Sequence, residues 1–241
     1  PYRRQRQMCI RDRRKIVLYA LFVAITLVLG LSPIGYIPIG VLEITIVHIP
    51  VIIGAFVLGI KGGALLGFVF GVTSLGRALM LPTPLSMVLL GTDTGFGWYN
   101  LFLIVIIVFV PRILVGVFSA LIYGAFEKRG ERETQSLEGL EGGALMEAKK
   151  RIDRRMILGT GVASLAGSVT NTVFFLGFTF FCAASLLAQS FGTDIAGIAT
   201  MLFTATGLLN GSIEAALSII ICTAVMRVLK KYMTVDRIGL R

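Results

Sequence analysis

The stretch HIPVIIGAFVLGIKGGALLGFVFGVTSLGRAL, residues 48–79, decides the fold. It reads as two hydrophobic helices joined by a short basic turn at 61–63. Glycine recurs every fourth residue at Gly63, Gly67 and Gly71, so the three glycines lie on one helical face. In water each would cost about 1 kcal/mol relative to alanine, whereas in a bilayer this spacing lets two helix backbones pack closely. The stretch is therefore predicted to form the packed centre of a membrane bundle.

The composition of the whole chain agrees with a membrane protein. Its 241 residues are 56% hydrophobic and 15% charged, with a mean hydropathy of +0.87, whereas a soluble domain usually carries about 25% charged residues. The net charge of +10 would suggest a nucleic-acid partner for a soluble protein. Here the basic residues lie between and beyond apolar stretches, which is the pattern of a protein embedded in membrane lipid. No nucleic-acid partner is expected.

Six segments come near the length of about 20 apolar residues that a spanning helix needs. They are 16–31, 44–59, 63–80, 101–126, 156–188 and 200–229. We predict an all-α membrane protein with six transmembrane helices in one domain, residues 15–232, and no cleavable signal peptide. Residues 1–14 form a basic tail that resembles translated sequencing-adapter DNA; a native cytoplasmic tail is the alternative.

The charges of the loops predict the orientation. Lysine and arginine concentrate in 127–155 and in the C-terminal segment, whereas 32–43, 81–100 and 189–199 carry only three acidic residues. Since basic loops stay in the cytoplasm, both termini are predicted inside the cell, with localisation to a bacterial plasma membrane. Segment 127–155 is predicted to be a solvated cytoplasmic connector. The extracellular loops are rich in proline, glycine and aromatic residues and are predicted to be structured.

Polar side chains fall on the small-residue faces of the predicted helices. Arg112 continues the row of Gly116, Ala120 and Gly124 by one step. Similarly, Asn171 continues the row Gly159, Ala163 and Gly167, and the sixth helix has the row Asn210, Glu214, Ser218 and Cys222. Because a charge in the membrane costs at least about 2.5–3.5 kcal/mol, these groups are expected to face the bundle interior and to serve function. The alternative is an Arg112–Glu214 ion pair that only holds the bundle together.

Signals for an enzyme are poor. His48 is the only histidine, so a multi-histidine zinc site is excluded. The sequence has neither a Walker A motif nor a GxSxG motif. We therefore expect no catalytic site, no metal and no cofactor in this chain, with any ATP used by partner subunits. His48 has both a structural and a ligand-binding interpretation.

Several motifs in order resemble one transporter family. They are SPIGYIPIG at 32–40, ITIVHIPVIIGAFVLGIKGGALLGFVFGVTSL at 44–75, FVPRILVGVFSALIYG at 109–124, SLAGSVTNTVFFLG at 164–177 and LLNGSIEAAL at 208–217. Over residues 15–231 the chain resembles the substrate-binding S component of energy-coupling factor (ECF) vitamin transporters, and within that family it looks most like the pantothenate S component.

The resemblance implies a six-helix protein that binds a vitamin near the outer face and hydrolyses no ATP. It implies docking onto a transmembrane coupling protein and two ATPase subunits, with Ala20 and Ala24 matching the family's alanine motif for the coupling protein. It also implies that loops 32–46 and 81–100 close over the ligand. The sequence departs from the family at Ile60, where relatives have proline, and at 42–50, where Glu43 leaves the identity of the vitamin open.

The predicted site combines one cation with several neutral polar groups, as pantothenate would need. The predicted substrate-binding residues are Tyr36, Glu43, Thr45, His48, Trp98, Asn100, Arg112, Asn171, Asn210 and Glu214. Arg112 is predicted to hold the ligand carboxylate and to meet Glu214 when the site is empty, and Trp98 has an alternative role as an interface anchor. The alternative function is a stand-alone secondary transporter of a small organic anion, driven by protons or sodium, with Glu214 as the coupling residue.

Overall fold

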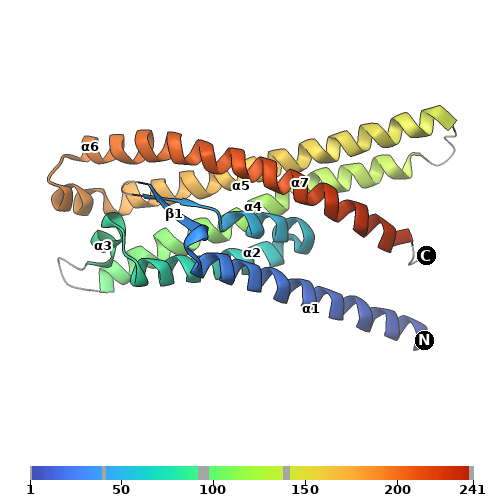
Figure 1. Cartoon of the computed structure of the whole chain (residues 1–241), viewed down its shortest axis with the longest axis horizontal. Helices are drawn as coiled ribbons and strands as arrows, with labels where there is room; N and C mark the ends of the chain where they lie inside the picture. The colour runs from blue at the N-terminus through green and yellow to red at the C-terminus, as the bar shows by residue number, and fades with distance from the viewer. Residues whose placement is uncertain (1, 40–41, 92–97, 138–141, 239–241) are drawn as a thin grey trace.

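The computed structural model describes residues 2–39, 42–91, 98–137 and 142–238 as a bundle of long helices (Figure 1). The elements in chain order are α1 (Tyr2–Leu31), η1 (Pro33–Gly35), β1 (Tyr36–Ile39), β2 (Leu42–Thr45), α2 (His48–Met80), α3 (Pro84–Leu90), α4 (Trp98–Gln135), α5 (Gly142–Phe191), α6 (Ile195–Thr200), the π-helix η2 (Met201–Asn210) and α7 (Gly211–Ile238). Five helical stretches within these residues are long and apolar enough to cross a membrane.

The bundle has two distinct ends. In Figure 1, α1 begins and α7 ends at one end, where α4 also ends and α5 begins. We call this the terminal end. The short helices α3 and α6 lie at the opposite end.

Helix α2 is a hairpin rather than one straight rod. Gly59 has φ +74° and ψ −167°, a non-helical conformation that in practice only glycine adopts. A Cβ on Gly54 would come within 2.2 Å of Leu66 Cδ1, although a straight helix would hold these residues roughly 18 Å apart. The two helices expected in 48–79 are therefore present. The reversal is at Gly59, so the prediction that 61–63 makes the turn was wrong by a few residues, and both arms are helical up to it.

The glycine row of α2 packs directly onto α4. A Cβ on Gly63 would approach the carbonyl oxygen of Gly116 to 2.4 Å, and one on Gly67 would approach that of Arg112 to 2.3 Å. A Cβ on Gly71 would meet the ring of Phe109. The predicted close approach of two backbones is confirmed, and it fixes the part of α4 that carries Arg112.

Most of segment 127–155, which was predicted to be a solvated connector, is helical. Helix α4 continues to Gln135, and α5 begins at Gly142, so only the short stretch between them joins the two helices. Glu133 forms ion pairs with Arg155 of α5 and Arg129 of α4, and Gly130 packs against Met156. The helices continue because their charged ends pair and pack with each other beyond the apolar region.

Two further expectations need correction. The first helix was expected over 16–31, but it begins at Tyr2 and includes most of the basic tail. The fold is also not purely α, since β1 and β2 form an antiparallel hairpin in which Tyr36 pairs with Thr45 and Ile39 with Leu42. Strand β2 contacts α7 and η2, and the hairpin lies within the length of the bundle (Figure 1). It is held there because it leads directly into the short first arm of α2.

Candidate ligand-binding site

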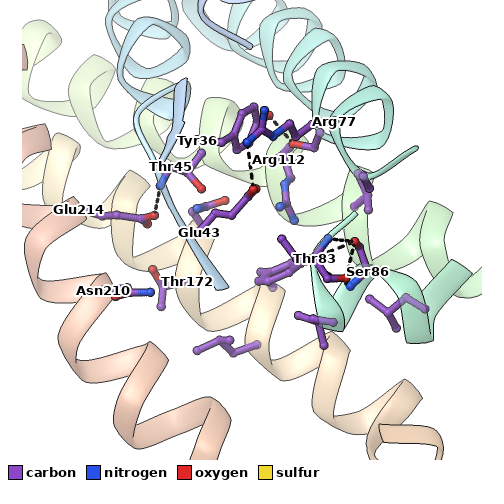
Figure 2. Close-up of a pocket in the computed structure, with 18 of the residues that line it drawn as sticks. Tyr36, Glu43, Thr45, Arg77, Thr83, Ser86, Arg112, Thr172, Asn210 and Glu214 are labelled. Atoms are coloured by element: carbon purple, nitrogen blue, oxygen red, sulfur yellow. Dashed lines mark hydrogen bonds and ion pairs between the residues drawn. The ribbon is translucent and has the colours of Figure 1, made fainter. Parts of the chain in front are cut away.

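A cavity of about 120 Å³ lies between the β-hairpin and the helices α2, α3, α4, α5 and α7 (Figure 2). Seven of the ten predicted site residues line it: Tyr36, Glu43, Thr45, Arg112, Asn171, Asn210 and Glu214. Its apolar wall includes Leu85, Val108 and Phe175. The polar faces predicted on separate helices therefore converge on one space.

Arg112 is held on the cavity wall by its own helix and by two aromatic rings. Its side chain is buried, with the guanidinium carbon 4.4 Å from the ring centroid of Phe175 and 5.6 Å from that of Phe70. Nη1 donates a hydrogen bond of 3.0 Å to the carbonyl oxygen of Ile107. That carbonyl is available because Pro111, four residues later, has no N–H to donate to it. The Pro111–Arg112 pair in the sequence thus fixes the guanidinium locally.

Glu214 binds the β-hairpin rather than Arg112. Its Oε1 accepts a hydrogen bond of 2.6 Å from the backbone N–H of Thr45 (Figure 2). No ion pair within 4.0 Å joins Glu214 to Arg112 in the described chain, so the expected pairing of the two in the empty site was wrong. The physical reason is that each group has another partner: Ile107 and the aromatic rings for Arg112, and Thr45 for Glu214.

The β-hairpin is attached to α2 on its other side. The hydroxyl of Tyr36 lies 2.8 Å from Ser74 Oγ and 3.3 Å from Thr73 Oγ1. Arg77 donates from Nη2 to Glu43 Oε1 at 3.4 Å, and its guanidinium lies 6.0 Å from the ring centroid of Tyr36. Burial raises the pKa of Tyr36 above its ordinary value, so the phenol stays neutral. The hairpin is thus bonded to both α2 and α7.

The sequence analysis missed Arg77 and Ser74 as site residues. Both follow Thr73 at the end of an apolar helix, and 73, 74 and 77 share one helical face. That spacing was the available signal. Neutral polar groups of Thr83, Ser86 and Thr172, also not foreseen, complete the lining.

Three predicted site residues lie elsewhere. His48 is fully buried at the start of α2, and neither ring nitrogen has a hydrogen-bond partner within the described residues. Asn100 is buried in the first turn of α4, and Trp98 is 87% exposed, which fits a membrane-interface anchor. None of the three lines the cavity. In the predicted loop 81–100, residues 84–90 form α3, and 92–97 lie outside the described residues.

The arrangement suits a small organic anion with several hydrogen-bonding groups. Arg112 supplies a cation without a carboxylate partner within the described residues, and Asn171, Thr172 and Asn210 supply neutral donors and acceptors. A guanidinium can hold a carboxylate through two parallel hydrogen bonds. Among the described residues no group of three His, Cys, Asp or Glu side chains could hold a metal ion.

Comparison with known proteins shows that the chain is similar to transporter components. The family model described as ECF transporter, substrate-specific component, matches residues 14–226. The chain is also 30% identical over 188 residues to the pantothenic acid transporter PanT of Lactococcus lactis subsp. cremoris (strain MG1363). That similarity covers 76% of this chain and 75% of the relative.

Proposed function

Because the chain belongs to the family of substrate-specific components of ECF transporters, we propose that it captures pantothenate outside the cell for import. In this proposal a transmembrane coupling protein and two ATPase subunits drive delivery of the vitamin to the cytoplasm. The similarity to a pantothenic acid transporter supports the choice of vitamin. The observation that carries the proposal is the cavity in which Arg112 has no carboxylate partner among the described residues.

The proposed topology has six spans with both termini in the cytoplasm. Five helical stretches have the length and hydropathy to span, and the two arms of α2 count as two passes of the chain. The terminal end carries the basic residues of 127–155 and of the C-terminal part of α7. Since basic segments remain inside, the terminal end faces the cytoplasm and the cavity opens toward the outside.

The chemical groups of pantothenate match the side chains that line the cavity. Arg112 holds the carboxylate of pantothenate, and the neutral side chains of Asn171, Thr172 and Asn210 bind its amide and hydroxyl groups. The apolar wall at Val108 and Phe175 covers its carbon atoms. Binding of this kind needs a planar fork of donors, which lysine lacks.

The test is calorimetric titration of the purified full chain with pantothenate. Arg112→Gln should weaken binding at least tenfold, about 1.4 kcal/mol. Arg112→Lys should also weaken it, because lysine keeps the charge and loses the two-point contact. Glu214→Gln should weaken binding less than Arg112→Gln, since its carboxylate bonds Thr45. Arg132→Gln, on the exposed end of the same helix, is the matched control. A folded Arg112→Gln protein with parental affinity would show that another group holds the carboxylate.

We also propose that loops 32–46 and 81–100 form the lid of the site. The proposal is supported by the β-hairpin, which contributes Tyr36, Glu43 and Thr45 to the cavity lining and is bonded to both α2 and α7. If the bound state adds contacts to the lid, pantothenate should slow hydrogen exchange there. Slowing confined to 127–155 would place the ligand at the terminal end and contradict this arrangement.

The buried carboxylate of Glu214 favours one second candidate, a secondary transporter driven by protons or sodium. Such a transporter would accumulate pantothenate in liposomes that contain this chain alone and an imposed ion gradient. The ECF proposal expects no accumulation there, and uptake only when the coupling protein, the ATPases and ATP are added.

A further inference from the structure

The charged residues around the cavity balance one another. Of the described residues that line it, four are charged: Arg77, Arg112, Glu43 and Glu214. Their formal charges sum to zero when all are ionised. A ligand with one negative charge therefore leaves the cavity with one excess negative charge, and a ligand with two leaves it with two.

The two arginines differ in how far their charge is available. Arg112 has no carboxylate within 4.0 Å among the described residues, so its guanidinium can pair with an anionic group of a ligand. Arg77 is already paired with Glu43 at 3.4 Å, and the side chains of the pair are only 14% and 16% exposed. Partial burial makes the charge of each partner matter more to a neighbouring ion than it would in water.

Glu43 lies on β2 and reaches over the cavity toward Arg77 (Figure 2). A ligand whose carboxylate is on Arg112 and whose far end is also anionic finds no second unpaired arginine among the described residues of the cavity. It meets instead the carboxylate of Glu43 or of Glu214. Leaving a charge of the wrong ligand without a partner and close to like charges is an effective means of rejecting that ligand.

We propose that Glu43, by occupying Arg77, restricts the site to ligands with a single negative charge. The inference rests on the proposed function and adds a selection rule to it. The site takes the free vitamin monoanion and rejects its phosphate monoester, which carries a carboxylate and a phosphate. Glu43 is thus a specificity-determining residue that acts by neutralising a cation.

The experiment measures a ratio of two affinities on the purified full chain in detergent. Each variant is titrated with pantothenate and with the 4′-phosphate ester of pantothenate. The parent should bind the phosphate ester at least 100-fold more weakly than pantothenate. Glu43→Gln frees Arg77 and should reduce that ratio at least tenfold. Glu147→Gln removes the same charge from an exposed position on α5 and should keep the parental ratio.

A double variant separates charge from lid structure. Glu43→Gln and Glu43→Gln/Arg77→Gln both lose the ion pair between the hairpin and α2, but only the single variant gains a free cation. The ratio should therefore move back toward the parental value in the double variant. An unchanged ratio in Glu43→Gln, or the same change in both variants, would overturn the inference while leaving pantothenate binding established. A parent that binds no pantothenate would overturn the proposed function and this inference with it.

Discussion

Helices α1 and α2 carry the same spacing of small residues and use it differently. In α2, Gly63 and Gly67 face α4 so closely that a Cβ would meet backbone atoms. In α1, Ala20 and Ala24 are exposed. Of the most apolar window of each helix, 61% is buried in α2 and 17% in α1. Small residues four apart therefore indicate a helical face that another helix can approach closely. Whether that face is buried shows whether the other helix belongs to the same chain.

This difference separates a permanent joint from a surface that is available to another protein. The α2–α4 contact fixes the backbone at Arg112, so the site depends on it. The exposed alanine face of α1 makes no such contact within the described chain. We propose it as the docking face for the coupling protein, since close helix contact in a membrane depends on small side chains.

The largest expected effect comes from placing a large side chain in the close contact between α2 and α4. Gly67→Leu would drive a side chain into the carbonyl of Arg112, and we expect a loss of more than about 3 kcal/mol in the free energy of unfolding. Thermal unfolding in detergent measures it. Gly76→Leu is the matched control on the same helix, because no atom of the described residues lies within 4 Å of a Cβ there. Equal melting temperatures for the two variants would break the comparison.

The next effect concerns the exposed row. Replacing Ala20 and Ala24 together with leucine should lower pantothenate uptake by the complete transporter at least tenfold, because the helices could no longer approach closely. Binding of pantothenate to the isolated subunit should stay at the parental level. Replacing both with glycine keeps the face small and is the control. Parallel loss of uptake and binding would show that the row serves the fold of the subunit.

The smallest expected effect concerns the small-residue row Gly116, Ala120 and Gly124 on α4, because only one end of this row is closely packed. A Cβ on Gly116 would come within 2.0 Å of the carbonyl oxygen of Gly63, whereas a Cβ on Gly124 would have no described atom within 4 Å. We expect Gly124→Ala to change the free energy of unfolding by less than about 0.5 kcal/mol, as at an open surface position. Gly116→Ala should cost about 1–3 kcal/mol. The same melting assay resolves both.

The features that the sequence predicted correctly are those that follow from the four-residue spacing of side chains along a helix. The glycine row of α2 does pack on another helix, and Asn210, Glu214, Ser218 and Cys222 are all buried, as the four-residue steps indicated. These features follow from which side chains share a helical face, and the sequence specifies that directly.

The features that the sequence did not predict depend on how different helices and strands are placed relative to one another in space. Strands β1 and β2 are too short to show a period, so the hairpin could not be distinguished from a loop. The sequence suggested that Arg112 and Glu214 pair in the empty site, but pairing depends on how each helix is rotated and on competing partners. The carbonyl of Ile107 and the N–H of Thr45 provide those partners. The helical ends of α4 and α5 were missed because charged sequence conceals a helix that only its neighbour stabilises.

The reversal at Gly59 has a consequence for how the protein is made. The first arm of α2, 48–58, is only roughly 16 Å long, about half the hydrocarbon thickness of a bilayer. On its own it is too short to be integrated as a span during synthesis. The second arm, 60–80, has sufficient length. Stable insertion of the first arm therefore has to wait until the second arm has been synthesised, and the reversal at Gly59 lets the first arm pack against the second.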